Sequence, residues 1–576
     1  MSLLSCGVSD LDAILSSVGG PSSAGGDVLQ HEPPPAEEEH VTPIDPVDDE
    51  EEEDDTLVEK SRKQSDTIKL GCKKGEDISP IKLKVSDLCN STGIFGATGS
   101  GKSYMIQHLI ETVCMQAPSI KNINVFDYKG DFAQMIVPGK DQRFESVANV
   151  NVFSVASDFG IKTTLDPFKR TDPLYSLDPF DDNKEGERRE FIAKSNELME
   201  AMLLGTISID KNGNPCLEGG FNTDLRKMVA GERGMTAVDR IAIASKFIDA
   251  GSAVIWKCKL AGNQYIPTSY EHFLFELKQL TTDRVGGGDF KDAPSQVHGM
   301  KAPFSSCSTD DLAKLADEIE ARAAEHTGMS MLFRSSRGKK PLDETVLLAS
   351  AEESKTNINI INLALLGDDT MGISHKKAVT ASVLRTIRTH APSLGGTPDN
   401  PSTMLVIDEA SELLPKTASN TKTGYDMSSI TCVESMMKVY RSKGVCVVLA
   451  TQAPGDLNPS LLKLIAGTRL IGKCRIGSKT DVDALKFLAG HASMGKASAK
   501  KEVRDAQSEF SDALKEVPRG EFLVFTSAST VTEDIKKIRA PKLKRKRENE
   551  SEWLGKDSKL KEWYTANEDG TRSRVY

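Results

Sequence analysis

The sequence of 576 residues lacks long apolar runs: no stretch reaches the roughly 18 consecutive apolar residues that a membrane-spanning helix requires. The N-terminus also lacks a basic residue ahead of its apolar part, which a secretory signal peptide would carry. These two absences argue against an integral membrane protein and a secreted protein. We therefore expect no membrane partner and a cytoplasmic location.

Metal-binding and hydrolytic motifs of other enzyme classes are also missing. None of the ten cysteines belongs to a Cys-x-x-Cys pair, so a zinc site is not expected. The nine histidines form no His-Glu-x-x-His motif and no clear triad with a serine. No internal repeat and no nuclease motif is visible. We expect no second active site.

The net charge of −11 is unevenly distributed. Residues 1–60 hold 17 acidic residues and one basic residue, so they carry −16 and the rest of the chain carries +5. The acidic segment has too little apolar surface to offset its ordering entropy, and we predict that it is disordered. It acts either as a solubilising tail or as an arm that mimics nucleic acid or binds a partner. The mildly basic body leaves a polyanionic partner possible.

Short runs rich in Ile and Val alternate with helical patterns from residue 67 onward. This alternation is typical of a buried, mainly parallel sheet in an α/β fold. The predicted strands are 81–85, 92–95, 123–126, 150–153, 357–363, 404–407, 445–450 and 522–525.

About 180 residues interrupt this alternation and read as mostly helical, so we interpret them as a large helical insertion. The predicted organisation is an acidic tail at 1–66, a first part of the core at 67–165, the insertion at 166–345, a second part of the core at 346–535 and a basic tail at 536–576.

The segment from Gly96 to Ser103 reads GATGSGKS and fits the P-loop pattern. It lies between a predicted strand and a helix, where the glycines can turn their amides toward phosphates. Lys102 is expected to reach the β- and γ-phosphates of ATP, and the Ser103 hydroxyl to bind Mg²⁺. The expected nucleotide-binding residues here are Gly96, Ala97, Thr98, Gly99, Ser100, Gly101, Lys102, Ser103 and Tyr104. A P-loop with a mainly parallel sheet predicts a RecA-like core.

A second nucleotide motif follows the strand at 404–407, which ends in Asp408 and Glu409. We predict that Asp408 is a metal ligand and that Glu409 polarises the attacking water. An Asp-Glu pair favours ATP hydrolysis over phosphoryl transfer to a hydroxyl, because water needs a base. The strand at 445–450 ends in Thr451 and Gln452, and we expect Gln452 to contact the γ-phosphate.

Four motifs in this order resemble the HerA/FtsK superfamily of ring translocases, most closely its HerA branch. They are GATGSGKS, the segment VFDYKGDF at 125–132, LVIDEASELLP at 405–415, and YRSKGV at 440–445 followed by LATQAPGDL at 449–457. The resemblance covers about residues 67–545, apart from much of the insertion. The family's N-terminal β-barrel is shortened or absent, since few ordered residues precede the P-loop.

The resemblance implies a homohexamer that moves double-stranded DNA with ATP and Mg²⁺, often beside a separate nuclease or effector protein. It places Asp127 and Asp131 near the γ-phosphate and makes Arg441 the arginine that a neighbouring subunit supplies. The family often has two adjacent basic residues there, whereas Ser442 follows Arg441, so Arg469 is a second candidate.

The segment 536–547 has 8 basic residues in 12. It is a solvated tail, a nucleic-acid contact or, in a eukaryotic setting, a nuclear import signal. For the whole chain, two alternatives to a DNA translocase or helicase remain. One is a viral packaging or conjugation-type motor, and the other is a regulatory NTPase that scaffolds a partner complex without moving DNA.

Overall fold

The computed structural model describes most of the chain between residues 67 and 539. The described residues are 67–72, 80–136, 142–155, 161–165, 355–368, 370–416, 424–474, 479–489, 512–526 and 536–539, with shorter pieces between 174 and 349 and at 510, 543, 564–566 and 572–574. The predicted acidic tail, residues 1–66, lies outside the described residues.

A 13-stranded sheet forms the centre of the described structure, in the order β13-β6-β5-β14-β4-β15-β16-β3-β17-β18-β19-β1-β2. Its strands are β1 (Thr67–Cys72), β2 (Pro80–Lys84), β3 (Thr92–Phe95), β4 (Asn122–Asp127), β5 (Ala148–Ser154), β6 (Ile161–Thr164), β13 (Lys340–Pro341), β14 (Thr356–Asn362), β15 (Thr403–Ile407), β16 (Val445–Thr451), β17 (Arg469–Ile471), β18 (Glu521–Phe525) and β19 (Lys536–Arg539). Neighbouring strands from β13 to β17 are parallel, and those from β17 to β2 are antiparallel. The prediction of a mainly parallel α/β sheet is confirmed.

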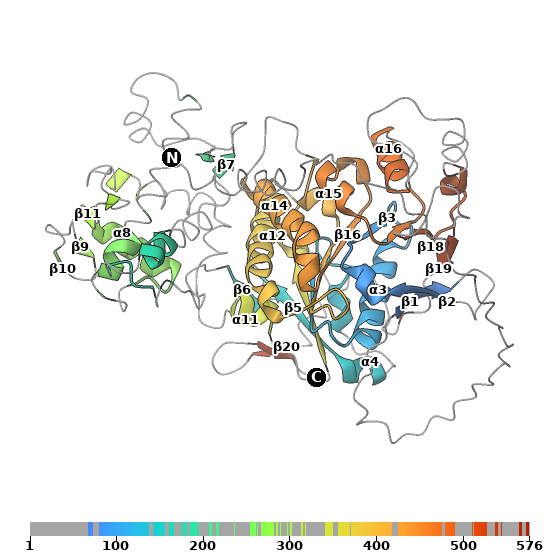
Figure 1. The fold of residues 1–576 in the computed structure, drawn as a ribbon, viewed down its shortest axis with the longest axis horizontal. Helices are drawn as coiled ribbons and strands as arrows, with labels where there is room; N and C mark the ends of the chain where they lie inside the picture. The colour runs from blue at the N-terminus through green and yellow to red at the C-terminus, as the bar shows by residue number, and fades with distance from the viewer. Residues whose placement is uncertain are drawn as a thin grey trace, which may run out of the picture. The chain divides into compact units, whose positions relative to one another are not determined.

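Helices cover both faces of this sheet. The helices are α2 (Val85–Leu88), α3 (Lys102–Gln116), α4 (Gln142–Val147), α8 (Tyr270–Leu280), α11 (Glu344–Leu347), α12 (Thr370–His390), α13 (Ala410–Leu413), α14 (Gly424–Lys438), α15 (Pro459–Leu464) and α16 (Lys479–Leu488). Short 3-10 turns are η1 (Ala133–Ile136), η5 (Ala364–Leu366), η6 (Ala391–Leu394), η7 (Tyr440–Lys443) and η8 (Pro454–Asp456). In Figure 1, α12 and α14 (yellow and orange) lie on one side of the strands and α3 (blue) on the other.

The side chains of β16 show why its sequence is apolar throughout. Val445, Val447 and Leu449 pack into the core beneath α12 and α14, whereas Cys446 and Val448 pack into the core beneath α3. Because successive side chains point to opposite faces, a strand covered on both faces needs apolar residues at every position. The apolar face predicted for α3 is buried in the same way, at Met105, Ile106, Leu109, Ile110 and Val113.

All eight predicted strands are present, with ends that differ by at most two residues. The prediction missed β1, β6, β13, β17 and β19, which are short or carry charged residues. The strand β19 changes the interpretation of the basic segment, because residues 536–539 pair with β18 and β1 instead of beginning a tail. In β19 Ile538 is buried and the neighbouring Arg539 is exposed, so a basic residue is tolerated on the face of the strand that is open to water.

The predicted insertion is described only in pieces. Residues 185–192 and 254–260 and α8 are helical, and three two-stranded antiparallel pairs accompany them. These pairs are β7 (Ile207–Ile209) with β8 (Pro215–Leu217), β9 (Arg284–Val285) with β10 (Gly288–Asp289), and β11 (Gln296–Val297) with β12 (Met300–Lys301). A last pair joins β20 (Tyr564–Ala566) to β21 (Arg572–Arg574).

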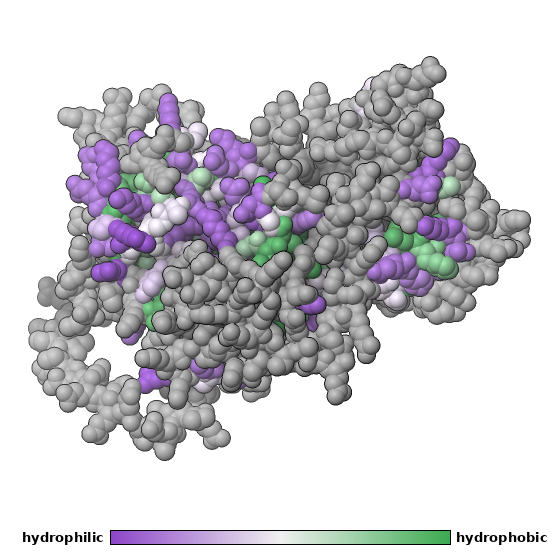
Figure 2. Space-filling view, turned by 180° about the vertical axis from the view of Figure 1, so that it is seen from behind, coloured by the Kyte–Doolittle hydropathy of each residue, from purple (hydrophilic) through white to green (hydrophobic). Residues whose placement is uncertain are grey.

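The surface of the described part is mixed in character. Figure 2 shows hydrophobic residues in separate areas bordered by hydrophilic ones. Among the described helices, none is long and apolar enough to cross a membrane.

The central strands should dominate the stability of the core, and Ile360 tests this. It lies on β14 between β4 and β5 and is fully buried. We expect Ile360→Ala to lower the free energy of unfolding by about 2–5 kcal/mol and Ile360→Val by about 0.5–1.5 kcal/mol, because truncation leaves a cavity. Urea unfolding of both variants measures this, and an equal loss in the two variants would contradict the cavity argument.

Candidate active site

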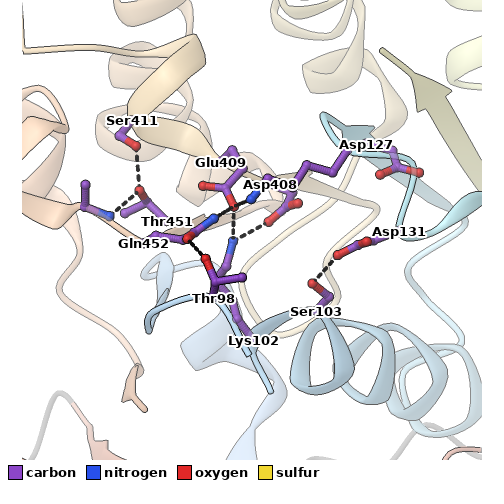
Figure 3. Close-up of polar contacts among 12 residues, drawn as sticks. Thr98, Lys102, Ser103, Asp127, Asp131, Asp408, Glu409, Ser411, Thr451 and Gln452 are labelled. Atoms are coloured by element: carbon purple, nitrogen blue, oxygen red, sulfur yellow. Dashed lines mark hydrogen bonds and ion pairs between the residues drawn. The ribbon is translucent and has the colours of Figure 1, made fainter. Parts of the chain in front are cut away.

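Four adjacent parallel strands deliver polar residues to one edge of the sheet. The strands β4, β15, β16 and β3 are neighbours, and each is followed by one of the motifs found in the sequence. The carboxyl ends of parallel strands meet at the same edge, where open α/β sheets bind ligands. Figure 3 shows the outcome: the P-loop, Asp131, the Asp408-Glu409 pair and Gln452 face one another.

The P-loop connects β3 to α3 in a conformation that requires glycine. Gly101, the N-cap of α3, has φ 100°, and Gly99 has φ 77°. A Cβ at Gly101 would also lie 3.1 Å from the Cα of Gly520, whose amide donates to the carbonyl of Ser100. The first amides of α3 have no acceptor within the helix, so together with the positive end of the helix dipole they form an anion site.

Lys102 joins the P-loop to the second motif through a buried ion-pair cluster. Its Nζ lies 2.7 Å from Asp408 Oδ1 and 2.9 Å from Glu409 Oε1, and the lysine is 6% exposed. Burial, the largest influence, lowers the pKa of Lys102, but the charges and hydrogen bonds of the two carboxylates outweigh it and raise the pKa overall. Burial raises the pKa of Asp408, and the charge of Lys102 offsets only part of this effect.

Glu409 has an unusual backbone and a crowded carboxylate. Its φ of 48° and ψ of 47° place it in the left-handed region, which costs a residue with a side chain about 1–2 kcal/mol. The oxygen Oε1 accepts hydrogen bonds from Lys102 Nζ, from Lys129 Nζ at 2.8 Å and from Gln452 Nε2 at 2.5 Å. Burial favours a higher pKa for Glu409, but the charge of Lys102 and these hydrogen bonds lower the pKa below its ordinary value.

Gln452 bridges the two halves of the site. Its amide nitrogen donates to Glu409, and its carbonyl oxygen accepts from the Thr98 hydroxyl of the P-loop at 2.5 Å. The preceding Thr451 is fixed beneath it, since its hydroxyl donates to Ser411 Oγ at 2.7 Å and accepts from the amide of Ala453. A movement of the P-loop can therefore shift the Glu409 carboxylate through the side chain of Gln452.

Asp127 and Asp131 have different roles in the loop that follows β4. The buried carboxylate of Asp127 accepts from the backbone amides of Gly130, Phe132 and Ala133, so it fixes the loop. Burial is also the main cause that raises the pKa of Asp127 well above its ordinary value. Asp131 faces the P-loop, where the Ser103 hydroxyl donates to its Oδ2 at 2.5 Å.

The oxygen atoms at this edge suit Mg²⁺, which prefers oxygen ligands. Asp408 is fully buried, and its Oδ2 has no hydrogen-bond partner within the described part of the chain. A buried carboxylate oxygen without a partner is costly unless a cation or water completes it. The residues predicted to hold Mg²⁺, Ser103 and Asp408, therefore fit the ion.

The two candidate arginines lie at the starts of β16 and β17, at the opposite edge of the sheet, whereas Tyr104 follows Ser103 in the first turn of α3. Arg441 is exposed on η7. Arg469 lies on β17 and donates to the backbone carbonyl of Thr526 at 2.6 Å, and burial lowers the pKa of its guanidinium. The Tyr104 hydroxyl accepts from the amide of Leu543 at 3.0 Å, so this residue contacts the C-terminal segment of its own chain.

Lys129 is the site residue whose role the sequence did not reveal. It belongs to the VFDYKGDF motif, but a lone lysine in a loop has no pattern that assigns it a partner. The available signal was its position between Asp127 and Asp131, in a motif that follows a strand beside β15.

Comparison with known proteins supports the resemblance. Residues 68–195, which include the P-loop and the loop after β4, match the family model of the helicase HerA central domain. This match confirms the resemblance indicated by the motifs over that range. No curated protein matches the chain.

Solved structures with some similarity include VirB4, a bacterial conjugative coupling protein and a viral genome packaging NTPase. VirB4 of Thermoanaerobacter pseudethanolicus has 13% identity and a TM-score of 0.44, over 83% of this chain and 97% of that chain. The bacterial conjugative coupling protein TrwB, in complex with a non-hydrolysable ATP analogue, has 12% identity and a TM-score of 0.45, over 84% and 90%. The genome packaging NTPase B204 of Sulfolobus turreted icosahedral virus 2 has 16% identity and a TM-score of 0.21, over 33% and 69%.

The fold and the site define the class of this protein: it is a P-loop NTPase. The family match adds that residues 68–195, around the P-loop, are similar to the HerA central domain.

The ion-pair cluster generates a prediction about stability without nucleotide. Lys102→Ala leaves the carboxylates of Asp408 and Glu409 buried without this cation, and breaking a buried pair costs roughly 3–5 kcal/mol. We expect the free energy of unfolding to fall accordingly, and the double variant Lys102→Ala/Asp408→Asn to recover part of the loss because one buried charge is removed. Urea unfolding without nucleotide measures both, and a double variant less stable than the single one would contradict the ion-pair explanation.

Proposed function

We propose that this chain is an ATP-hydrolysing DNA translocase or helicase of the HerA type, which acts as a homohexamer on double-stranded DNA. The observation that carries the proposal is the convergence of Lys102, Asp408 and Glu409 at the carboxyl edge of the sheet. Mg²⁺-dependent hydrolysis of ATP requires these three groups together: a cation for the phosphates, a metal ligand and a base.

The P-loop side of the site binds and polarises the phosphates. The amides of the P-loop and the first turn of α3 point at the β-phosphate, and Lys102 moves from the carboxylates to the β- and γ-oxygens. Asp408 and Ser103 would hold Mg²⁺, and the bound ion would supply charge neutralisation at the phosphate oxygens. Asp131, hydrogen-bonded to Ser103 in the structure, orients that hydroxyl.

The opposite side supplies the base. Glu409 accepts a proton from the attacking water. Gln452 responds to the presence or loss of the γ-phosphate, because its hydrogen bonds connect Thr98 of the P-loop to Glu409. An Asp-Glu pair of this kind suits water as the nucleophile, since a water needs an orienting base close to the phosphate.

Contact with DNA is proposed from charge. Outside residues 1–60 the chain carries +5, and the segment 536–547 concentrates eight basic residues. Since residues 536–539 form β19, the basic residues that follow, at 542–547, are the better candidates for phosphate contacts. Binding through phosphates gives strong dependence on salt and little sequence preference.

A ring arrangement is proposed from the family resemblance and from the position of Arg441. An exposed arginine outside its own site is free to complete the site of a neighbouring subunit, and ATP then binds between subunits. Because no nuclease motif is visible in the sequence, a partner that cuts DNA or another effector would be a separate protein.

Replacing the base should separate binding from turnover. We expect Glu409→Gln to bind ATP with near-normal affinity, because shape and hydrogen bonding are kept, and to lose ATP hydrolysis by at least about 100-fold. ATP binding is measured by calorimetry and turnover by phosphate release.

The same variant tests the motor. Wild-type protein with ATP should displace a protein roadblock from double-stranded DNA, and Glu409→Gln should not. Hydrolysis without displacement in the wild type would support an NTPase that scaffolds a complex and would contradict the DNA-motor proposal.

Arg441 should act across an interface. We expect Arg441→Ala to lower ATP turnover, as arginine fingers contribute on the order of 1,000-fold or more. Mixing it with Lys102→Ala should partly restore turnover, because each mixed interface can join an intact P-loop to an intact arginine. Steady-state hydrolysis across mixing ratios measures this. If mixing restores nothing, Arg441 does not act in trans, and Arg469→Ala is the matched variant to compare.

A further inference from the structure

Three side chains donate hydrogen bonds to the carboxylate of Glu409. One oxygen, Oε1, accepts from Lys102, Lys129 and Gln452 at 2.9, 2.8 and 2.5 Å. The residue also has a left-handed backbone, a conformation that persists only where the surroundings impose it. The position of this side chain therefore depends on its hydrogen-bond partners.

Two of the three hydrogen-bond partners of Glu409 also contact other residues of the site. Lys102 also pairs with Asp408 and, in the proposed ATPase, is needed at the phosphates. Gln452 also accepts a hydrogen bond from the Thr98 hydroxyl, so a displacement of the P-loop would shift its side chain. Within the described part of the chain, the ion pair of Lys129 is with Glu409 alone.

Lys129 comes from a loop whose backbone is held by hydrogen bonds to its own residue Asp127. Asp127, at the end of β4, accepts from three amides of this loop, and Gly130 adopts φ 86° to close it. The lysine is 42% exposed, whereas the Glu409 side chain is 5% exposed, so the ammonium approaches the carboxylate from the solvent side.

A cavity beside Glu409 explains why a cation is needed on that side. It is lined by Tyr128, Lys129, Asp368, Glu409, Ser411, Glu412 and Gln452, with two alanines. Asp368 and Glu412 bring two further carboxylates to the same cavity, and Asp368 is paired with the buried Lys376. Because Lys376 offsets the charge of Asp368, Glu412 is the carboxylate of this cavity that would repel Glu409 without Lys129 when Lys102 turns to the phosphates.

We propose that Lys129 is the positioning residue for Glu409: it keeps the catalytic carboxylate in place on the cavity side while Lys102 is engaged by nucleotide. This inference rests on the proposed ATPase function. It assigns Lys129 no contact with the phosphates, so its loss should affect turnover and not binding.

The test is the split between kcat and nucleotide affinity in Lys129→Met, which keeps an unbranched side chain one atom shorter and removes its charge. We expect kcat to fall about 10- to 100-fold, the effect of a misplaced catalytic group. The Kd of a non-hydrolysable ATP analogue, measured by calorimetry, should change by less than about twofold. Lys129→Arg should recover most of kcat, because a single charge-assisted hydrogen bond does not depend on the shape of the cation.

A matched control variant and a second mutant background show whether the loss of kcat comes from the contact between Lys129 and Glu409. Lys515 pairs with Asp512 at 3.0 Å in a similar but fully surface-exposed contact, so Lys515→Met should leave kcat unchanged. In the Glu409→Gln background, Lys129→Met should lower residual turnover by less than about twofold, because positioning has no effect without the base. Lys129→Gln is the second variant if Lys129→Met does not fold.

Three results would overturn the inference. The first is an unchanged or increased kcat in folded Lys129→Met. The second is a loss of affinity for the ATP analogue as large as the loss of kcat. The third is a loss of turnover on adding Lys129→Met to Glu409→Gln that equals the loss it causes in the wild type. If Glu409→Gln alone removes turnover in these experiments, the proposed ATPase function stands and only the role of Lys129 is refuted. If Glu409→Gln hydrolyses ATP normally, the ATPase assignment of the site fails first.

Discussion

The buried contact of Lys102 with Asp408 and Glu409 is the interaction on which the rest of the site depends. Moving an ammonium and a carboxylate out of water costs several kcal/mol per ion, and only close, hydrogen-bonded pairing offsets that cost. The distances of 2.7 and 2.9 Å meet this requirement. They can do so because β3 and β15, separated only by β16, end at the same edge of the sheet. The strand order that packs the core is therefore also what makes a buried charge cluster tolerable.

In the loop after β4, the buried carboxylate of Asp127 stabilises the backbone. Asp127 is engaged by three backbone amides of its own loop, so it stabilises the chain path that carries Lys129 and Asp131 to the site. The family resemblance predicts that Asp127 lies near the γ-phosphate, and the structure places it at the carboxyl end of β4, beside β15. Its hydrogen bonds, however, are those of a structural brace. A carboxylate with both oxygens bound to amides has little capacity left for a metal ion or a phosphate-bound water.

The sequence predicted the central sheet well because the inner strands are buried on both faces. That condition forces runs such as 445–450 to be apolar throughout, which is a strong signal. The outer strands do not meet this condition: β1 alternates, β17 is three residues long, and three of the four residues of β19 are basic, so its sequence was interpreted as part of a tail. For the site, the P-loop, Asp408, Glu409 and Gln452 were predictable because their spacing follows strand ends. The pairing of Lys129 with Glu409 and of Tyr104 with Leu543 was not, because each joins residues hundreds of positions apart and depends on loop geometry.

The arrangement of donors around Glu409 also constrains how nucleotide binding and hydrolysis can be connected. In the proposed ATPase, Lys102 cannot serve phosphates and carboxylates at full strength at once, so nucleotide binding would weaken its contact with Glu409. Gln452 is tied to Thr98 as well as to Glu409, so it is displaced or retained according to what the P-loop holds. On this proposal two of the three hydrogen bonds to the carboxylate would vary with the nucleotide, and the left-handed backbone at Glu409 cannot by itself fix the side chain. Whatever keeps the base aligned during the reaction must come from outside the P-loop, and Lys129, on a loop braced by Asp127, meets that condition.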